Sequence, residues 1–423
     1  MNVYEELQWR GLVNQITHDD LPKRLAEEQF TLYCGFDPTA DSLHIGSLLP
    51  IMTLVHFQRA GHRPLALVGG GTGLIGDPSG KTDERTLLSR EQVEANCVGI
   101  RGQLERFLTF EGPSAAVMLN NADWLCGLPL IEFLRDVGKF FSVNVMLSRE
   151  SVKQRLESRD HGISYTEFSY SLLQAYDFLE LCRRHDCRLQ VGGSDQWGNI
   201  VAGMDLTRRL EQKDTFGLTI PLVTKADGSK FGKSEGGNIW LDASRTSPYR
   251  FYQFWLNQSD EDVVRYLKFF TLLDRATVEE LEKQTQEAPH QRAAQKRLAE
   301  EVTRLVHGDA ALTQALKATE AMFGGDLGGL DEAALLDIFS EVPSGELPKA
   351  ALAEGGSLLE ALTSGGVFAS KSEARRMIQN GGLYVNNLRI EDENAKLEPS
   401  HCLAAGLAVV RKGKKNYHLL RFV

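Results

Sequence analysis

A short stretch around His44 contains the residue types best suited to nucleotide chemistry. Residues 32–36 form an apolar run that predicts a buried strand, and the Asp-Pro-Thr that follows ends it, because proline supplies no N–H for strand pairing. Helical apolar spacing follows, and Pro50 suits a first helical turn, so we expect a helix to begin at residue 46 or 47. His44 and Ser47 would then lie among free N–H groups that attract phosphate. A lone histidine at this place is more often only a helix cap, so the neighbouring segments decide between the two.

Two glycine-containing segments further along the chain suit the same chemistry. Gly192, Gly193 and Asp195 lie in a predicted turn between a strand and a helix, where a carboxylate either caps the helix or binds a ribose hydroxyl. Because the two glycines allow a ligand to approach the backbone closely, we favour ribose. The other segment, residues 225–237, combines several glycines with Lys230 and Lys233. Its composition suits a solvated surface loop, but also a lid that closes on a triphosphate.

The glycine-rich loop at residues 69–82 partly matches two nucleotide-binding patterns but satisfies neither. Its glycines fit the dinucleotide fingerprint G-x-G-x-x-G, yet the acidic residue expected about 20 residues later on a strand is missing, because that region reads as a helix. A P-loop fails as well, since its leading glycine would fall on Ile75. The sequence therefore argues against a dehydrogenase. Asp77, Lys81 and Arg85 beside so many glycines predict a backbone that lies close to a substrate.

A polar stripe runs along a long predicted helix at residues 166–184. Tyr170, Gln174 and Asp177 are spaced i, i+4 and i+7, so they share one face. Such a stripe is usually solvated, but apolar side chains occupy most of the rest of this helix. The sequence therefore predicts that the stripe lines a pocket.

Five apolar runs separated by helical patterns predict an α/β fold with a Rossmann-like parallel sheet that binds a nucleotide. These runs are residues 32–36, 64–68, 115–119, 188–191 and 218–223. We expect four regions: a nucleotide-binding domain at 1–247 with a helical insertion at about 121–186, an α-helical domain at 248–323, a linker at 324–356 with one amphipathic stretch at 330–339, and a small α+β domain at 357–423. In the last region, Ser370 is predicted to cap a helix, and two hairpins follow it.

Charge is distributed unevenly along the chain. The net charge is −10, yet residues 366–423 carry 10 Lys and Arg against 5 Asp and Glu, whereas residues 1–365 carry 37 against 52. A basic module on an acidic body is typical of a protein that binds nucleic acid through that module. The basic side chains gather on the predicted helix and at the tip of the last hairpin, namely Lys371, Arg375, Arg376, Arg411, Lys412, Lys414 and Lys415.

Length and composition exclude other classes of protein. With 423 residues, 42% hydrophobic and 25% charged, the chain has the balance of a soluble protein of two or three domains. No apolar run reaches membrane-spanning length and the first residues do not read as a signal peptide, so we expect a cytoplasmic protein with no membrane partner. The 6 cysteines include no C-x-x-C pair, which argues against a zinc site or a disulfide framework.

Two segments carry a resemblance to a known family. His44-Ile45-Gly46-Ser47 resembles the HIGH signature of class I aminoacyl-tRNA synthetases, and Lys230-Phe231-Gly232-Lys233-Ser234 resembles their KMSKS signature. The flanking words at residues 33–39 and 192–199 are similar to those of bacterial tyrosyl-tRNA synthetases, and the resemblance covers the whole chain. It implies that L-tyrosine is activated by ATP, as its Mg²⁺ complex, and is then transferred to tRNA(Tyr). It also implies a homodimer formed through the helical insertion, and a C-terminal RNA-binding module like that of a ribosomal protein.

The resemblance further implies a role for each site residue. Catalysis would depend on His44 and on four cationic side chains at the phosphates, Lys81, Arg85, Lys230 and Lys233. Tyrosine would be bound by Tyr33 and Asp177 at its hydroxyl, by Tyr170 and Gln174 at its amino group, and by Asp77 and Gln196. ATP would be bound by Gly35, Asp37, Thr39, His44, Gly46, Ser47, Gly192, Asp195, Lys230, Lys233 and Ser234. The family usually has a second histidine where this chain has Ser47, so one phosphate contact must be made differently.

Two other functions stay open on the sequence alone. A tryptophan-specific member of the same class would recognise an indole, which only donates, whereas Tyr33 with Asp177 suits a hydroxyl that both donates and accepts. A non-catalytic RNA-binding protein would use the basic module alone. The sequence offers no evident covalent nucleophile and no set of metal ligands, which fits phosphoryl transfer, because that chemistry depends mainly on positioning and charge.

Overall fold

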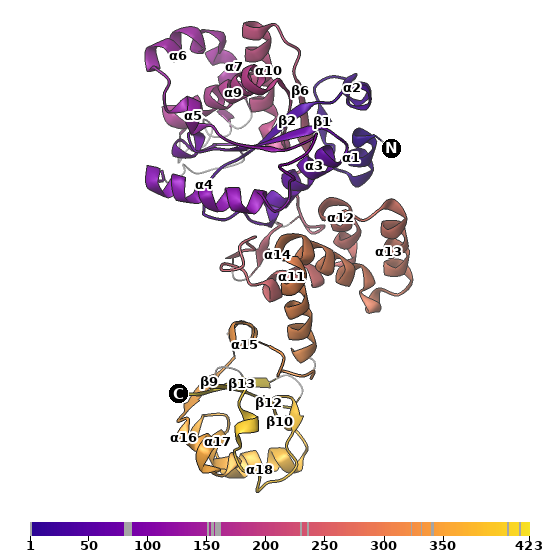
Figure 1. Cartoon of the computed structure of the whole chain (residues 1–423), viewed down its shortest axis with the longest axis vertical. Coiled ribbons are helices and arrows are strands. Elements are labelled where there is room, and N and C mark those ends of the chain that lie inside the picture. The colour runs from indigo at the N-terminus through magenta and orange to yellow at the C-terminus, as the bar shows by residue number, and fades with distance from the viewer. Residues whose placement is uncertain are drawn as a thin grey trace. The chain divides into compact units, whose positions relative to one another are not determined.

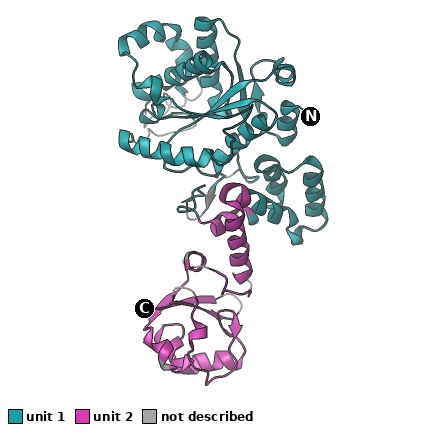
Figure 2. Ribbon diagram, in the orientation of Figure 1, with its two compact units in different colours: residues 1–246, 256–302 teal, residues 247–255, 303–423 magenta. Residues whose placement is uncertain are grey.

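The computed structural model of the chain divides into two compact units (Figure 2). Unit 1 comprises residues 1–246 and 256–302, and unit 2 comprises residues 247–255 and 303–423. The structure describes residues 2–79, 87–149, 152–153, 156, 162–228, 231–234, 237–322, 324–330, 332–339, 342–403, 406–413 and 416–423. Each unit has a sheet and hydrophobic clusters of its own.

Unit 1 is built on a six-stranded sheet with the order β1-β6-β5-β2-β3-β4. Five strands run parallel: β2 (Thr31–Phe36), β3 (Arg63–Val68), β4 (Val117–Asn120), β5 (Cys187–Gly193) and β6 (Phe216–Ile220). Each overlaps with one of the five predicted strands, with ends displaced by up to three residues, so the predicted α/β fold with a parallel sheet is confirmed. The antiparallel edge strand β1 (Gln15–Ile16) is too short to give a sequence pattern, and the sequence did not indicate it.

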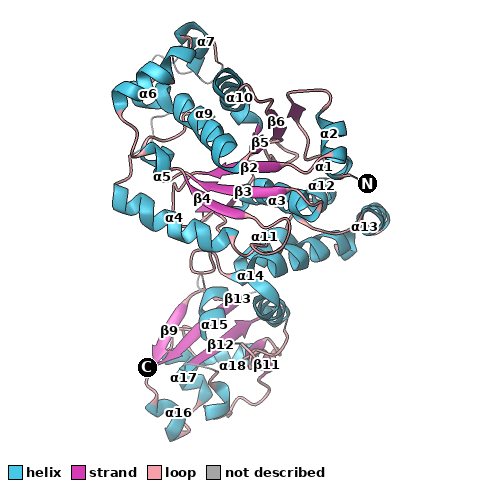
Figure 3. Cartoon of the chain, turned by 45° about the horizontal axis from the view of Figure 1, so that its top comes forward, coloured by secondary structure: helices cyan, strands magenta, loops and turns pink. Residues whose placement is uncertain are grey.

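Helices cover both faces of this sheet (Figure 3). α3 (Leu48–Arg59) and α4 (Arg90–Leu104) lie on one face, and α9 (Tyr165–His185) and α10 (Trp197–Glu211) lie on the other. Because both faces are covered, the parallel strands read as continuous apolar runs rather than as alternating ones. The turn η1 (Ile45–Ser47) precedes α3, so the regular helix begins slightly later than the predicted residue 46 or 47.

The direction of chain progression reverses in the middle of the sheet. From β2 the chain moves outward through β3 to β4, whereas from β5 it moves the other way to β6. The loops that follow β2 and β5 therefore diverge and leave a crevice at the carboxyl ends of these strands. In open α/β sheets this is where ligands bind.

The other elements of unit 1 are mostly helices (Figure 1). They are α1 (Val3–Arg10), α2 (Leu21–Glu27), α5 (Ala122–Leu125), α6 (Leu130–Asp136), α7 (Val143–Leu147), α12 (Asp260–Phe270) and α13 (Arg275–Glu287), with the turns η2 (Thr72–Leu74), η3 (Gly138–Phe140), η4 (Ser194–Gln196) and η5 (Pro289–Gln291). β7 (Lys233–Ser234) and β8 (Gly237–Asn238) form a small hairpin. α11 (Pro248–Leu256) and α14 (Ala293–Met322) each contribute residues to both units.

Unit 2 contains a five-stranded sheet with the order β11-β10-β12-β13-β9. Its strands are β9 (Ser344–Leu347), β10 (Leu383–Val385), β11 (Leu388–Arg389), β12 (Leu407–Lys412) and β13 (Asn416–Phe422), and its helices are α15 (Glu332–Ile338), α16 (Ala350–Glu354), α17 (Leu358–Ser364) and α18 (Lys371–Gln379), with the turn η6 (Pro399–His401). The predicted hairpins are present, and the Ser370 side chain accepts a hydrogen bond from the Glu373 N–H at the start of α18, as expected of a cap.

The stretch at 324–356, which we expected to be mainly linker, contributes structure to unit 2. β9 lies in it and pairs in parallel with β13 at the edge of the sheet. Ala318 and Ala321 from the end of α14 also pack in one cluster with Leu407 and Leu419 of the sheet. The sequence of this glycine-rich stretch does not predict such packing, because the contacts are made with strands that follow much later in the chain.

None of the helices in the described parts of the chain is long and apolar enough to cross a membrane.

Arg10, at the end of α1, fixes the connection between α12 and α13. Its guanidinium donates to the backbone oxygens of Lys268 (3.0 Å), Thr271 (2.9 Å) and Leu273 (2.7 Å), and it pairs with Glu6 at 2.7 Å. The side chain is only 2% exposed, and this burial lowers the pKa of Arg10. The planar fork of arginine is well suited to several acceptors at once.

We expect Arg10→Met to lower the free energy of unfolding of unit 1 by about 3–5 kcal/mol, because it leaves three carbonyls and the Glu6 carboxylate without their buried donor. Arg24→Met is the matched control, since Arg24 is 34% exposed and pairs with Asp20 at the surface, a contact worth at most ~1 kcal/mol. Urea denaturation followed by circular dichroism measures both. Equal losses in the two variants would contradict the anchoring role of Arg10.

Candidate functional site

A cavity of about 240 Å³ lies at the crevice between the ends of β2 and β5. Residues from β2, the glycine-rich loop, α9 and the turn after β5 line it. All six residues predicted to bind tyrosine are among them: Tyr33, Asp77, Tyr170, Gln174, Asp177 and Gln196. The structure therefore brings together side chains that lie far apart in the sequence, and it confirms that the polar stripe of α9 lines a pocket.

Tyr33 and Asp177 are buried in this cavity. The Asp177 carboxylate, 2% exposed, accepts hydrogen bonds from Asn121 Nδ2 at 2.9 Å and from Trp124 Nε1 at 2.7 Å. Burial raises the pKa of Asp177 to about 7, and these two donors oppose the rise. The Tyr33 hydroxyl has no hydrogen-bond partner among the described residues. Burial, together with the charge of Asp177, raises the pKa of Tyr33 well above its ordinary value, so this hydroxyl stays protonated.

Other polar groups of the cavity are paired with the carboxylates of Asp77 and Asp37. Gln196 Nε2 donates to Asp77 Oδ2 at 2.8 Å and to Asp195 Oδ2 at 3.2 Å. The N–H of Ser79 donates to Asp77 Oδ1 at 2.9 Å, which holds the carboxylate in place. The Tyr170 hydroxyl lies 3.4 Å from both carboxylate oxygens of Asp37. The Asp195 side chain does not cap either helix that begins here, which removes the structural alternative considered for it.

A second cavity, of about 480 Å³, adjoins the first and shares Gly35 and Asp37 with it. His44 and further residues predicted to bind ATP line it: Thr39, Gly46 and Ser47. His44 Nδ1 accepts a hydrogen bond from the Gly46 N–H at 3.0 Å, so the ring folds over the start of the helix. A side chain at position 46 would place its Cβ only 2.7 Å from a ring carbon of His44, which explains the glycine. Gly192 and Asp195 lie in the first cavity instead.

The second signature segment, residues 230–234 with their resemblance to KMSKS, is described only in part. Phe231 lines the second cavity, and its ring stacks on Phe270 of α12 at 5.5 Å between ring centres. The backbone of Lys233 and Ser234 forms β7. Lys81, Arg85 and Lys230, which we predicted to meet the phosphates, lie outside the described residues, as do the side chains of Lys233 and Ser234.

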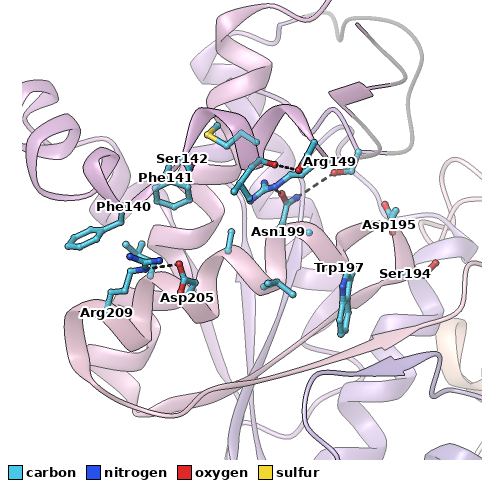
Figure 4. Close-up of a pocket in the computed structure, with 18 of the residues that line it drawn as sticks. Phe140, Phe141, Ser142, Arg149, Ser194, Asp195, Trp197, Asn199, Asp205 and Arg209 are labelled. Atoms are coloured by element: carbon cyan, nitrogen blue, oxygen red, sulfur yellow. Dashed lines mark hydrogen bonds and ion pairs between the residues drawn. The ribbon is translucent and has the colours of Figure 1, made fainter. Parts of the chain in front are cut away.

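A third cavity, of about 850 Å³, lies between α7 and α10 (Figure 4). Arg149 reaches Asn199 at 3.5 Å, and Asn199 in turn lies 3.4 Å from Ser79 Oγ. Arg209 pairs with Asp205 at 2.7 Å along α10. This cavity is larger than the other two, but among the described residues Asp195 is the only predicted site residue in its lining, so its volume does not make it the candidate for tyrosine or ATP.

The predicted tRNA-binding side chains lie in unit 2 and make different contacts. Arg375 pairs with Glu393 at 3.4 Å, and Lys371 pairs with Glu360. The Arg411 guanidinium stacks 3.8 Å from the centre of the Tyr384 ring, and Lys412 Nζ donates to the Val367 carbonyl at 2.7 Å. Arg376 is exposed on α18. Lys414 and Lys415 lie outside the described residues.

The sequence analysis missed the side chains that support the cavity from β4 and α5. Asn120 Oδ1 and Asn121 Oδ1 accept hydrogen bonds from the N–H groups of Gly70 and Gly71, at 3.1 and 2.7 Å, and so hold the glycine-rich loop. Trp124 and Asn121 both donate to Asp177. Two asparagines at the carboxyl end of a predicted strand were the available signal, because that end of a parallel sheet faces the ligand.

Comparisons with known proteins identify the family of the chain. The family model for class I tRNA synthetases (W and Y) matches residues 25–324, and the model for the tyrosine–tRNA ligase SYY-like C-terminal domain matches residues 335–420. The chain is 57% identical to the tyrosine–tRNA ligase of Geobacillus stearothermophilus, with 100% of each chain covered. It is 55% identical to that of Roseiflexus castenholzii, with 100% of this chain and 99% of the relative covered.

Solved structures of tRNA synthetases are also similar to this chain. A C-terminally truncated mitochondrial tyrosyl-tRNA synthetase of Aspergillus nidulans is 31% identical with a TM-score of 0.69, covering 76% of this chain and 94% of that one. A tryptophanyl-tRNA synthetase of Encephalitozoon cuniculi bound to tryptophan has a TM-score of 0.51 over 73% of this chain and 86% of that one, and at 16% identity it shows the shared fold alone. The family model over most of the chain and the full-length relatives show that the chain belongs to the tyrosine–tRNA ligase family of class I tRNA synthetases.

Proposed function

We propose that this chain activates L-tyrosine with ATP and then transfers the tyrosyl group to the 3′ end of tRNA(Tyr). The observation that carries the proposal is the buried pair of Tyr33 and Asp177 in the cavity at the centre of the sheet. A buried hydroxyl without a partner costs free energy that a ligand can recover. A tyrosine phenol is suited to this pair, because it donates to the Asp177 carboxylate and accepts from the Tyr33 hydroxyl.

Other polar groups of the cavity suit the two charged ends of the amino acid. The amino group of tyrosine is a donor, and Asp77, Tyr170 and Gln174 offer acceptor oxygens around the same cavity. Gln196 holds Asp77 in its orientation. The carboxylate of tyrosine would then face the second cavity, where we place ATP with its Mg²⁺, because the two cavities share Gly35 and Asp37.

The reaction requires positioning and charge rather than a covalent intermediate with the protein. A tyrosine carboxylate oxygen attacks the α-phosphorus of ATP, the bond to the bridging oxygen breaks, and pyrophosphate leaves. His44 and the helix start beside it are placed to stabilise negative charge on the phosphates, and Lys81, Arg85, Lys230 and Lys233 are proposed to take up the charge of pyrophosphate. The terminal ribose hydroxyl of tRNA then attacks the carbonyl carbon of the adenylate, and AMP leaves.

The test of this function is tyrosine-dependent exchange of labelled pyrophosphate into ATP, measured with each of the twenty amino acids separately. We expect tyrosine alone to support rapid exchange. Tryptophan as the best substrate would replace the proposal with a tryptophan-specific enzyme, and absence of exchange with every amino acid would leave an RNA-binding protein without activity.

The buried carboxyl of Asp177 should make tyrosine binding depend on pH. Because the pKa of Asp177 is about 7 in the empty site, the ionised fraction of this carboxyl rises from about a tenth at pH 6 to about nine tenths at pH 8. The phenol donates to the ionised form, so tyrosine affinity should rise by roughly tenfold over this range. Fluorescence titration with tyrosine measures it. Asp177→Asn should bind tyrosine more weakly and with little pH dependence, and an affinity of the wild-type protein that is flat with pH would contradict this role of Asp177.

We propose that unit 2 binds tRNA through its basic side chains. Arg375 and Arg376 on α18 are exposed, while Arg411 is held in place by stacking on Tyr384. The packing of unit 2 determines which change best tests tRNA binding. A chain shortened near residue 325 would expose Ala318 and Ala321, which pack against the sheet of unit 2, so removing charges is a cleaner change than removing the domain.

The double variant Arg375→Ala with Arg376→Ala should weaken tRNA binding and reduce the slope of log affinity against log salt by about two units, because each arginine releases counterions from RNA. Pyrophosphate exchange should be unchanged. Arg90→Ala with Arg101→Ala on α4 removes the same charge from unit 1, where both arginines are more than 60% exposed, and it should leave the slope unchanged. Equal slopes for the two double variants would show that α18 does not contact tRNA.

We further propose a homodimer formed through the helices between β4 and α9. Ile131 (73% exposed) and Leu130 (67%) on α6, with Val143 (58%) and Val145 (59%) on α7, are large apolar side chains left in solvent. Exposed apolar residues grouped in this way mark a surface that another protein covers. Val145 also lines the third cavity, together with Val201 of α10. The proposed surface therefore continues along the apolar wall of that cavity to α10.

Ile131→Asp should convert the dimer into a monomer, because it would bury a charge in an apolar interface at a cost of several kcal/mol. Analytical ultracentrifugation at micromolar concentration gives the mass. Leu388→Asp in unit 2 changes a similarly exposed residue (72%) outside this surface and should leave the mass unchanged. A wild-type protein that sediments as a monomer would end the proposal.

A further inference from the structure

The Ser42 hydroxyl is the centre of a buried set of hydrogen bonds immediately before His44. Ser42 is 4% exposed, and its Oγ donates to the Leu43 carbonyl at 2.8 Å. The same oxygen accepts hydrogen bonds from Gln103 Nε2 at 2.9 Å and from the Asp242 N–H at 3.2 Å. A hydroxyl has one donor and two acceptor positions, so every one of them is used.

Gln103, on α4, holds this backbone from the other side. Its Oε1 accepts a hydrogen bond from the Leu43 N–H at 2.9 Å while its Nε2 donates to Ser42. Gln103 is itself 4% exposed. One side-chain amide therefore fixes both residues that precede His44, and its loss would leave several buried polar groups without partners.

Two further residues of α4 contact the loop between β2 and His44. Asn96 Nδ2 donates to the Pro38 carbonyl at 2.9 Å. At Gly99, a Cβ would lie 2.0 Å from the carbonyl oxygen of Asp41, so the helix backbone itself touches the loop. Asn96, Gly99 and Gln103 are spaced i, i+3 and i+7 and share one face of α4. This face follows the loop from the end of β2 to His44.

The same hydrogen bonds reach the second signature segment. The Leu241 N–H donates to the Leu43 carbonyl at 2.8 Å, and the Ile45 N–H donates to the Ile239 carbonyl at 3.0 Å. The Ile239 N–H in turn donates to the carbonyl of Gly232, at 3.0 Å. A continuous set of bonds therefore runs from Gln103 through Ser42 to the segment that contains Lys233.

We propose that Gln103 and Ser42 are positioning residues for adenylate formation, which hold the loop of His44 in register with Gly232 and with residues 239–242. The inference rests on the proposed function, in which His44 meets the phosphates of ATP. Gln103 is not among the described residues that line either cavity, and the hydroxyl of Ser42, at the wall of the second cavity, is already engaged in three hydrogen bonds. Both residues act through the backbone, and because a displacement of about 1 Å at a reacting group can lower the rate on the order of 100-fold, small shifts of this loop have large effects.

The test is Gln103→Met, which keeps the length of the side chain and removes both hydrogen bonds. We expect kcat for tyrosine-dependent pyrophosphate exchange to fall by about 10- to 100-fold, with KM for tyrosine unchanged within about twofold, because residues 42–44 do not line the tyrosine cavity. Gln58→Met is the matched control. Gln58 makes the same kind of bridge, donating to the carbonyls of Thr109 (2.6 Å) and Ser114 (3.0 Å) and accepting from the Thr109 N–H (2.9 Å), and none of these residues belongs to a signature segment.

Measuring the melting temperatures of both variants distinguishes a loss of kcat caused by mispositioning from one caused by lower stability. A fall in kcat for Gln103→Met alone, with similar melting temperatures, supports the proposal, whereas equal kcat values for the two variants overturn it. If Gln103→Met does not fold, Gln103→Glu, which keeps the acceptor for the Leu43 N–H, and Ser42→Ala take its place, and each should lower kcat with the tyrosine KM unchanged. Failure of the proposed function is seen separately, as absence of tyrosine-dependent exchange in the wild-type protein, and it would overturn the inference as well.

Discussion

The catalytic unit depends on keeping one carboxylate, that of Asp177, ionisable inside the protein. Burying a carboxylate without partners costs several kcal/mol, and here burial raises its pKa to about 7 rather than further because Asn121 and Trp124 both donate to it. Those donors come from the end of β4 and from α5, so the sheet must bring β4 near α9 before the site can exist. The fold and the polar site therefore depend on the same contacts.

Asn121 also explains why the glycine-rich loop lies where it does. Its amide donates to Asp177 and to Thr72 Oγ1, while its oxygen accepts from the Gly71 N–H. The loop that carries Asp77 is thus tied to the residue that supports Asp177, and both walls of the tyrosine cavity are set by one side chain. From α4, on the opposite face of the sheet to α9, Gln103 does the same for the loop of His44. In both loops a side-chain amide from a neighbouring element replaces regular secondary structure as the source of order.

The sequence predicted the parallel strands and the polar stripe of α9 because both depend on local periodicity. A buried parallel strand is a continuous apolar run, and Tyr170, Gln174 and Asp177 share a face by helical spacing alone. Their meeting with Tyr33 followed from the resemblance to a family rather than from the pattern. The partners of Asp177 are 53 and 56 residues away in the chain, and Gln103 is 61 residues from Ser42, so no local pattern indicates them. The strands β1 and β9 were missed because short edge strands carry too few residues for a pattern to appear.

In the proposed function, Tyr33 and Asp177 recognise the hydroxyl of the amino acid. The most direct measurement is the ratio of kcat/KM for tyrosine to that for phenylalanine, in pyrophosphate exchange, for the wild-type protein and for Tyr33→Phe. We expect the ratio to fall by roughly tenfold or more in Tyr33→Phe, on the scale of one lost hydrogen bond, with KM for ATP unchanged. A ratio that is the same in both proteins would contradict the account, because it would mean that Tyr33 does not contact the phenol.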